Sequence, residues 1–339
     1  MSAGGRVMIR LSLSDLHDLA VDVLTASKTS PENAAAVARA LVKADADGIP
    51  SHGVSRLPAY ADQAKAGKVD GFAAPEVTTP KTASIRVDAK SGFAYPAIEA
   101  GIDAALKRIG ETGIVGLAIG NSHHAGVAGH HVEPFAEQGY LALGFTNSPA
   151  AIAPWGGSRA IYGTNPIAFA CPMEGKPPII ADLSTSKVAR GKIKLAAEKG
   201  EAIPEGWAVD ADGQATTDAK AAMGGTLLPM GDAKGAALVL MVEILAATLT
   251  GSNHGFEASS FFDDKGPAPH IGQFFIIIDP QGFSGGAFNS RLDVLAEAIL
   301  SQDGTRMPGE RRFKIRETSA RDGVDIPDSL LDELKSRAG

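Results

Sequence analysis

The sequence lacks the features that would place it in an oxidising compartment or in a membrane. Its 339 residues include one cysteine, Cys171, so no disulfide can form within the chain, which favours a reducing compartment. The longest apolar segment, residues 235–249, is interrupted by Glu243 and is too short to cross a bilayer. Residues 1–13 contain no apolar signal-peptide core. We therefore expect a cytoplasmic protein with no membrane partner.

The chain also has fewer basic than acidic residues. The chain carries 32 Lys and Arg residues against 39 Asp and Glu residues, which gives a formal net charge of −7. Nucleic-acid-binding proteins usually need a basic face to displace counterions, so we expect no nucleic-acid partner. A small anionic ligand remains possible, because a few well-placed arginines bind an anion inside an acidic protein.

The familiar nucleotide-binding and nucleophile motifs are missing. No GxGxxG fingerprint follows a predicted strand, and the nearest glycine cluster, residues 282–286, has the wrong spacing. The sequence also lacks a Walker motif, a GxSxG elbow and a CxxC pair. A Rossmann-type site is not supported, so evidence for a cofactor must come from other residues.

The hydrophobic pattern changes near residue 80 and predicts an α/β fold. Before that point the apolar spacing is helical, and after residue 85 short apolar runs alternate with helical segments. We expect a mainly helical domain formed by residues 1–80 plus 290–339, and an α/β domain with a mixed sheet formed by residues 81–289. The expected strands are residues 85–88, 113–119, 141–146, 167–170, 179–182 and 274–278. The expected helices are residues 13–24, 31–47, 57–66, 96–109, 234–249, 290–301 and 326–337, with residues 67–80 as a loop.

The first cluster that could perform chemistry is Ser51-His52-Gly53-Val54-Ser55-Arg56. Reduction of a C=O or C=N bond needs a proton near neutral pH, and histidine is the side chain suited to deliver it. Arg56 lies one helical turn beyond His52 and could hold a carboxylate in bidentate fashion. The alternative is a solvated loop at the end of a helix.

The second cluster, residues 121–131, holds four of the eight histidines: His123, His124, His130 and His131. Such density suggests a metal site and, with it, a metal-dependent hydrolase. Two imidazoles on a helix share a metal at a spacing of three or four residues, whereas these are adjacent or six to eight apart. We therefore expect no metal. The small residues that open the cluster could instead bring backbone amides to an anionic cofactor.

Several loop segments add weaker signals. Asp182-Leu183-Ser184 follows an apolar strand, where α/β proteins place ligand contacts, although either polar residue could simply cap a helix. Residues 163–166 and 231–235 are similar loops, and Lys234 would be a surface lysine in most proteins. Residues 306–312 place three arginines around a Pro-Gly turn, which suits phosphates, although a solvated charge run is the default reading.

Taken in order, these segments resemble the type-2 malate/L-lactate dehydrogenase family, whose members lack a conventional Rossmann fold. The resemblance spans nearly the whole chain. It rests on Ser51-His52-Gly53…Arg56, Asn121-Ser122-His123-His124, Gly163-Thr164-Asn165-Pro166, Asp182-Leu183-Ser184-Thr185-Ser186, Lys234-Gly235 and Pro308-Gly309-Glu310. Within the family the sequence is most similar to the Δ1-piperideine-2-carboxylate/Δ1-pyrroline-2-carboxylate reductases, which use NADPH to reduce a cyclic imine beside a carboxylate.

The resemblance implies a role for each segment. His52 would donate the proton with Ser51 as its relay partner, Arg56 would bind the carboxylate and Thr164 would contact the substrate; His124 is a rival for the acid–base role. The α/β domain would bind NADPH, with NADH as the alternative, and the helical domain would hold the substrate and form a homodimer. The residues implied at the cofactor are His124, Ala125, Gly126, Val127, Ala128, Ser148, Asp182, Leu183, Ser184, Lys234, Gly235, Arg306, Pro308, Gly309, Glu310, Arg311 and Arg312.

One departure bears on the substrate. The imine reductases carry His-Gly-Asp where this chain has Arg190-Gly191-Lys192, and that aspartate is assigned to the serine relay. A lysine cannot play the same part, and Gly-Lys at this point is typical of the 2-oxo-acid dehydrogenases. Reduction of a cyclic imine to L-proline or L-pipecolate is therefore the first expectation, and a malate- or L-lactate-type 2-hydroxy acid dehydrogenase is the alternative.

Overall fold

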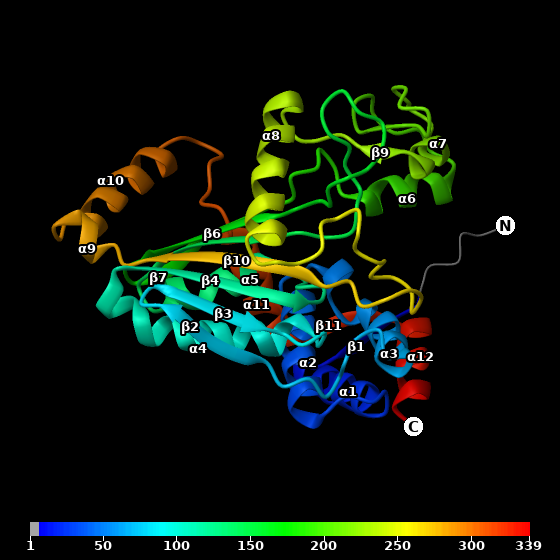
Figure 1. Cartoon of the computed structure of the whole chain (residues 1–339), viewed down its shortest axis with the longest axis horizontal. Helices are drawn as coiled ribbons and strands as arrows, with labels where there is room; N and C mark the ends of the chain where they lie inside the picture. The colour runs from blue at the N-terminus through cyan, green and yellow to red at the C-terminus, as the bar shows by residue number, and fades with distance from the viewer. Residues whose placement is uncertain (1–6) are drawn as a thin grey trace.

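A seven-stranded mixed sheet lies at the centre of the fold, and the computed structural model describes residues 7–339 of the chain (Figure 1). Strands β3 and β4 pair in parallel, and all other neighbours in this sheet are antiparallel. The expected mixed α/β class is confirmed. In spatial order the strands are β2 (Glu76–Lys81), β3 (Ser84–Asp88), β4 (Ile114–Ser122), β10 (Ile271–Ile278), β5 (Leu141–Thr146), β6 (Ile167–Met173) and β7 (Lys176–Leu183).

Strand β10 is central because almost all of its side chains are apolar. Phe275 and Ile277 are buried on the face that α4 and α5 cover, whereas Phe274, Ile276 and Ile278 alternate onto the opposite face and are only partly buried. Figure 1 shows α4 on one side of the sheet, with α8 and α10 on the other. The sheet therefore has one fully covered face and one partly open, apolar face.

The helices begin where the sequence supplies caps. The Ser30 hydroxyl accepts from the amide of Asn33, and Pro31 occupies the first helical position, as the sequence predicts. No helix in the described part of the chain is long and apolar enough to span a membrane. The α-helices are α1 (Leu13–Thr25), α2 (Pro31–Ala46), α3 (Leu57–Ala66), α4 (Ala94–Thr112), α5 (Gly129–Glu137), α6 (Arg190–Lys199), α7 (Ala219–Gly224), α8 (Asp232–Glu243), α9 (Gln281–Ser284), α10 (Phe288–Leu300), α11 (Glu310–Asp322) and α12 (Asp328–Ala338).

Several expected boundaries are wrong. The predicted loop 67–80 contains the start of β2, which the pattern hides because this edge strand is exposed along its whole length. The predicted helix 326–337 begins two residues later, because β11 (Val324–Pro327) pairs with β1 (Met8–Leu11). The predicted helix 234–249 begins at Asp232 and continues beyond α8 as one π-helical turn, η3 (Ile244–Thr248).

Five helices, α5, α6, α7, α9 and α11, and four short strands, β1, β8 (Ala208–Val209), β9 (Thr226–Leu227) and β11, were not predicted. Helices α5, α6 and α11 have few apolar residues at helical spacing, and α5 contains Pro134, so tertiary contacts rather than pattern determine them. Strand β1 pairs only with β11, and β8 pairs only with β9. The predicted turn at residues 306–312 ends at Gly309, and α11 begins at the next residue, Glu310.

The buried residues form three cores. One lies under the sheet with α4 and α5, one joins α1, α2 and α3 to β11 and α12, and a smaller one surrounds α6, α7, β8 and β9. Helix α10, which belongs to the predicted helical domain, has one buried residue, Ala296, and lies over the far end of the sheet (Figure 1). The division into two functional domains stays a prediction.

A buried ion network ties α11 to the first two cores. The Arg316 guanidinium donates to the carboxylates of Asp47, just after α2, and Glu133 on α5, whose side chains are both 0% exposed. Lys43 pairs with Glu133 at 3.0 Å, and the His130 ring lies 2.8 Å from the Asp47 carboxylate. Helix α11 therefore fixes the end of α2 relative to the sheet.

Replacing Arg316 with alanine should strongly destabilise the protein. Two buried carboxylates would lose their main counter-charge, and breaking such a pair typically costs about 3–5 kcal/mol. Arg39→Ala is the matched control, because its ion pair with Glu99 is exposed and should contribute under about 1 kcal/mol. Urea unfolding of both variants measures the difference. A loss below 1 kcal/mol for Arg316→Ala would show that the network does not hold the two cores together.

Candidate active site

Two consecutive 3-10 turns, η1 (Pro50–His52) and η2 (Val54–Arg56), place Ser51, His52 and Arg56 between α2 and α3. The Ser51 hydroxyl lies 3.0 Å from Nδ1 of His52. Nε of Arg56 donates to the Ser51 carbonyl at 2.7 Å, and the outer edge of its guanidinium makes no hydrogen bond with any described residue, so this edge is free for a ligand. The three residues singled out in the sequence therefore share one rigid turn.

A buried carboxylate holds this turn in place. The Val54 amide donates to Asp45 at 2.7 Å, and the Asp45 carboxylate lies so close to Gly53 that a Cβ there would come within about 2.2 Å of it. Only glycine fits at that position. Burial raises the pKa of the Asp45 carboxyl to about 7, and the Val54 amide partly offsets this. The sequence analysis did not identify Asp45.

His124 lies just beyond the end of β4 and faces the same turn. Its ring centroid lies 5.6 Å from that of His52. Its Nδ1 lies 2.6 Å from the Tyr60 hydroxyl, which in turn lies 3.3 Å from the hydroxyl of Tyr95. The structure thus brings together the two histidines that are rivals for the acid–base role, and the hydroxyl of Tyr60 fixes the orientation of the second.

Two consecutive phenylalanines from the loop before β10 cover these groups. The Phe261 ring packs on His124 with centroids 4.8 Å apart. The Phe262 ring lies over the guanidinium of Arg56, with its centroid 4.6 Å from Cζ. A cation–π contact of this kind contributes about 0.5–1 kcal/mol at an exposed position. Neither phenylalanine was predicted at the site.

Both imidazoles are neutral at pH 7 in the ligand-free protein. Burial lowers the pKa of His52 to about 4, the positive charge of Arg56 adds to the effect, and the negative charge of Asp182 opposes it. Burial also lowers the pKa of His124 well below its usual value, with Arg56 and His52 contributing. A neutral imidazole can accept a proton as a base, whereas proton donation requires that a ligand first change this electrostatic balance.

The segment from His124 to Gly129 meets Asp182 and Arg312. The Asp182 carboxylate accepts from the Gly129 amide at 2.9 Å and from Arg312 at 3.4 Å. A Cβ at Gly129 would lie 2.6 Å from Nη1 of Arg312 and 3.0 Å from the Asp182 carboxylate, so glycine lets both side chains pack against the backbone there. That Nη1 is buried and has no hydrogen-bond partner within residues 7–339, so a hydrogen-bond donor remains unused beside this segment.

Ser148, Thr164 and Ser184 also come together. The Ser148 hydroxyl accepts from the amide of Thr164 at 3.1 Å, and Ser184 donates to the Thr164 carbonyl at 3.3 Å. Gly163 lies so close to Ser148 that a Cβ would not fit. Two strand ends, those after β5 and β7, are thereby linked through Thr164.

The remaining predicted cofactor residues lie around this region. Gly235 packs on the Met230 carbonyl, and the Met230 amide donates to the carbonyl of Thr185, so the start of α8 is tied to the segment after β7. The Pro308 carbonyl accepts from the amide of Ile180. Gly309 packs against Ile180 with a positive φ that favours glycine, and Glu310 begins α11. Leu183, Lys234, Arg306 and Arg311 are exposed.

The four clustered histidines do not converge on a common point. Within residues 7–339, no group of three or more His, Cys, Asp or Glu side chains could hold a metal ion. Each ring has a partner in the protein, which is Gln63 for His123, Tyr60 for His124, Asp47 for His130 and the Ala125 carbonyl for His131.

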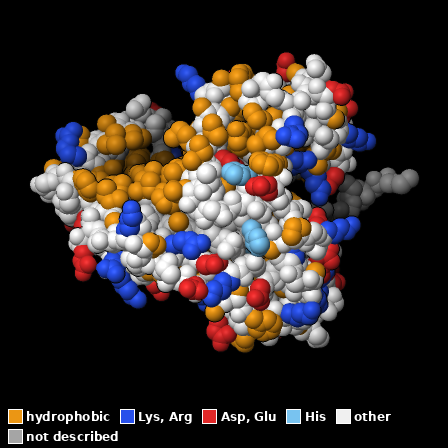
Figure 2. All heavy atoms as spheres, viewed as in Figure 1, with side chains coloured by type: hydrophobic (Ala, Val, Ile, Leu, Met, Phe, Trp, Pro, Cys, Tyr) orange, Lys and Arg blue, Asp and Glu red, His pale blue; other side chains and the backbone are white. Residues whose placement is uncertain are grey.

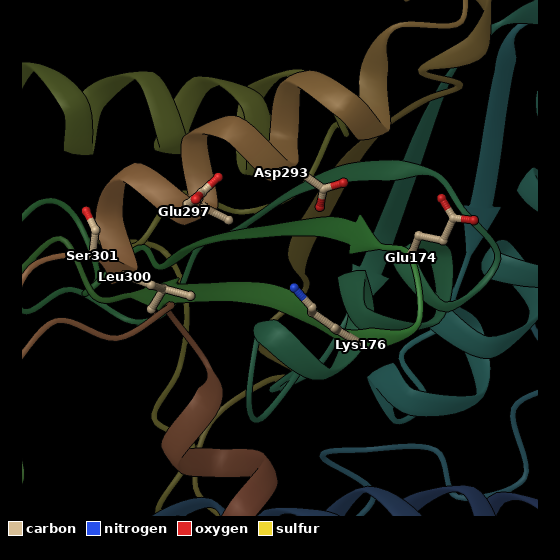
Figure 3. A pocket seen from close by; sticks show the side chains of 7 residues that line it. Glu174, Lys176, Asp293, Glu297, Leu300 and Ser301 are labelled. Atoms are coloured by element: carbon tan, nitrogen blue, oxygen red, sulfur yellow. The ribbon is translucent and has the colours of Figure 1, made fainter.

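A further groove lies away from these residues. This groove of about 790 Å³ separates α10 from the β6–β7 hairpin, with Asp293 and Glu297 on the helix opposite Lys176 on β7 (Figure 3). It lies at the end of β7 opposite Asp182. None of the residues predicted for catalysis or binding lines it.

With this geometry established, comparison with known proteins is decisive. A family model described as malate/L-lactate dehydrogenase matches residues 11–335. The chain belongs to the malate/L-lactate dehydrogenase family. The predicted family membership is thus confirmed, and the protein is an oxidoreductase that uses a nicotinamide cofactor.

Three relatives illustrate the range of this family. The chain is 49% identical to a (2R)-3-sulfolactate dehydrogenase (NADP(+)) of Chromohalobacter salexigens, over 97% of this chain and 98% of the relative. It is 40% identical to a Δ1-pyrroline-2-carboxylate/Δ1-piperideine-2-carboxylate reductase of Pseudomonas putida, over 98% of each chain. The crystal structure of Δ1-piperideine-2-carboxylate reductase from Pseudomonas syringae superimposes with a TM-score of 0.92 at 39% identity, covering 97% of this chain and 99% of that one.

The site residues that were not predicted were missed for different reasons. Tyr60 lies among the apolar residues of α3, so it reads as core. Phe261 and Phe262 belong to a loop without periodicity, although two adjacent aromatics in a polar loop are themselves a signal. Asp45 and Asp47 end α2, where acidic residues are disfavoured by the helix dipole, and that anomaly could have identified them.

The buried imidazoles predict sensitivity to acid. The pKa of histidine in an unfolded chain is about 6.5. Burial lowers it in the folded protein to about 4 for His52 and His131 and to about 3 for His123. Between pH 6.5 and 4 the unfolded chain therefore binds protons that the folded chain does not, so stability falls as the pH is lowered. Asp45 acts in the opposite direction, but one carboxyl does not outweigh three imidazoles.

The urea midpoint should consequently be lower at pH 5 than at pH 7. The variant His17→Gln, which changes a surface residue of α1, should show the same pH dependence as the wild type. A midpoint that is equal or higher at pH 5 would contradict the assignment of neutral, buried imidazoles.

Proposed function

We propose that the protein is an NAD(P)H-dependent reductase of a small substrate with a C=N or C=O group next to a carboxylate. The first candidate is reduction of Δ1-pyrroline-2-carboxylate or Δ1-piperideine-2-carboxylate to L-proline or L-pipecolate. The observation that carries the proposal is the guanidinium of Arg56, held with a free edge beside the imidazoles of His52 and His124. Homology to two cyclic-imine reductases supports the substrate class.

The residues around Gly129 fit a dinucleotide. Nη1 of Arg312 is buried and has no partner in the described part of the chain, so it is a donor for an anionic oxygen of the cofactor. We propose that the binding surface is formed by His124, Ala125, Gly126, Val127, Ala128, Ser148, Asp182, Leu183, Ser184, Lys234, Gly235, Arg306, Pro308, Gly309, Glu310, Arg311 and Arg312. This would be a non-Rossmann site within the α/β domain of residues 81–289, with the substrate held by the helical domain of residues 1–80 and 290–339.

The reduced cofactor supplies the hydride that adds to the carbon of the C=N or C=O bond. Arg56 binds the substrate carboxylate with its free edge and so fixes the position of that carbon. His52, oriented by Ser51, gives its proton to the nitrogen or oxygen as negative charge develops there. We propose that Thr164, whose carbonyl accepts from Ser184, also contacts the substrate. A cyclic imine that binds already protonated depends less on His52 than a carbonyl does.

A neutral His52 cannot donate a proton, and we propose that substrate binding makes it protonated. A carboxylate at Arg56 offsets the positive charge that helps to lower the pKa of His52 in the free protein. The same anion attracts the imidazolium, so binding raises the pKa of His52 and couples substrate binding to proton uptake. In the reverse direction the neutral imidazole is already the base that accepts the proton of a hydroxyl or amine.

A 2-oxo acid is a second candidate substrate. It is favoured by the (2R)-3-sulfolactate dehydrogenase at 49% identity and by the exposed Lys192 in Arg190-Gly191-Lys192, where imine reductases carry aspartate. A lysine near the site would suit a second anionic group on the substrate, as in malate or sulfolactate. The alternative of a metal-dependent hydrolase has no comparable support.

A substrate panel decides between the two candidates. We expect oxidation of NADPH, and more slowly of NADH, with the cyclic imines. Faster turnover of 3-sulfopyruvate, oxaloacetate or pyruvate would assign the protein to the 2-hydroxy acid dehydrogenases. No turnover of any member of the panel would contradict the proposed function. The preference for NADPH is proposed from the arginines at residues 306–312, which suit a 2′-phosphate.

His52→Ala should lower kcat by about 10²–10⁴-fold, the usual effect of losing a general acid. His124→Ala is the comparison, because its ring lies 5.6 Å from that of His52 and Phe261 packs on it. Measuring both variants with the best substrate assigns the role. Near-normal turnover in His52→Ala, together with a large loss in His124→Ala, would transfer proton donation to His124.

We also propose that the protein is a cytoplasmic homodimer. The open face of the sheet displays partly exposed apolar side chains, including Phe145, Phe169 and Ile276, and Figure 2 shows hydrophobic side chains gathered between α8 and α10. A second copy would cover such a face symmetrically. Light scattering should give twice the chain mass of 34.8 kDa, and a monomer would contradict the proposal.

A further inference from the structure

The loop between η3 and β10 is long and lacks regular secondary structure. It runs over about twenty residues, from Leu249 to His270, and only bends and turns occur in it. Loops of this length inside a compact fold usually have a binding function or are disordered. This one is held in a defined conformation, so its function is the question.

A buried lysine fixes the centre of the loop. The Lys68 side chain is 1% exposed, and its ammonium donates to the carbonyls of Ser260, Asp263 and Lys265 at 2.7, 2.9 and 2.7 Å. These three bonds use every donor of the ammonium, which is what a buried charge requires. The Asp263 carboxylate lies 3.6 Å away and balances the charge.

Gln63 on α3 is a second anchor, and it contacts Phe261, which lies between Ser260 and Asp263 in the loop. The Gln63 amide donates to the Phe261 carbonyl at 2.9 Å, while its oxygen accepts from the ring of His123 at 2.7 Å. The anchored stretch is therefore residues 260–265. Both anchors belong to α3 or follow it directly, and α3 begins right after Arg56. The loop and the carboxylate-binding turn are thus fixed to the same helix.

The anchored stretch presents two aromatic rings in opposite ways. Phe261 is 4% exposed and packs on His124, as expected for a core residue. Phe262 is 73% exposed, yet it is positioned over the face of the Arg56 guanidinium. Two contacts limit access to Arg56: the Ser51 carbonyl occupies its Nε, and Phe262 covers one face of the guanidinium. A ligand can therefore bind at the outer edge.

We propose that Phe262 is a specificity-determining residue of the substrate site. A carboxylate bound in the plane of Arg56 places its α-carbon and the attached carbon chain beside the Phe262 ring. The ring therefore supplies an apolar wall for that chain and keeps the guanidinium in the orientation that binds the carboxylate. Lys68 and Gln63 are positioning residues that act through this ring. The inference rests on the proposed role of Arg56 as the carboxylate ligand.

Phe262→Ala tests the wall directly. The KM for the carboxylate substrate should rise about 2- to 5-fold, the scale of a lost cation–π contact, with kcat within about twofold of the wild type. The ratio of kcat/KM between substrates with larger and smaller carbon chains should also change. The control is Phe256→Ala, which removes another exposed phenylalanine of the same loop that stacks on His254. Lys68→Met should reproduce the KM effect, and Lys65→Met on the surface of α3 should not.

A binding measurement separates this inference from the proposed reaction. Phe262→Trp places a fluorophore over Arg56, and oxalate, a planar carboxylate that cannot be reduced, is titrated in the presence of NADP+. We expect a saturable change in emission that disappears when Arg56→Ala is added and that is absent in Phe256→Trp. This result supports the inference even if none of the panel substrates turns over. Active enzyme with unchanged emission in Phe262→Trp, or unchanged KM values in Phe262→Ala, would overturn the inference and leave the proposed function standing.

Discussion

The site depends on the bidentate contacts of one arginine with two carboxylates inside the protein. Arg316 binds Asp47 at the end of α2 and Glu133 on α5, and four residues earlier on the same helix Arg312 contacts Asp182. These contacts connect the helical core that carries His52 to the sheet that carries His124. They add to the contacts that Tyr60 and Gln63 on α3 make with His124 and His123 beyond the end of β4.

The same contacts explain why two carboxyl groups at the end of α2, those of Asp45 and Asp47, differ in pKa. The guanidinium of Arg316 and the ring of His130 hold the pKa of Asp47 at about 2 despite its burial, so it is ionised at neutral pH. Asp45, two residues earlier, makes no ion pair with any residue that the structure describes, and burial raises its pKa to about 7. The first carboxyl contributes ion pairs that define position, and the second accepts a backbone hydrogen bond that defines a turn. Two similar side chains thus have different tasks because only one faces an arginine.

How much of this could be read from the sequence depends on the range of the interaction. The turn from Ser51 to Arg56 and the capped start of α2 are local features, and their residue types indicate their chemistry. The central position of β10 is not local, because its neighbours β4 and β5 lie about 130 or more residues away in the chain. The short apolar run at residues 274–278 predicted strand β10. Its position between β4 and β5 could not be predicted, because it depends on which face of the strand is buried in the folded protein.

The roles of α11 and of the loop before β10 could not be predicted from the sequence, because they too depend on contacts between residues far apart in the chain. Helix α11 is polar on most of its surface, because it binds through Arg312 and Arg316 rather than through an apolar stripe, and hydrophobic periodicity cannot detect such a helix. Lys68 gives no signal either, since a lysine after a helix is usually solvated. Both become recognisable only when their buried partners are known.

The same physical logic sets the order of events at the site. A pocket with an arginine and two uncharged imidazoles has a net positive character, which attracts a carboxylate before any proton is available to it. In the proposed mechanism, a bound carboxylate offsets the positive charge of Arg56, which together with burial lowers the pKa of His52 in the free protein. We propose that Phe262, over one face of the guanidinium, strengthens this coupling because charges interact more strongly where solvent is absent. In this proposal, binding and activation are consequences of the same ion pair.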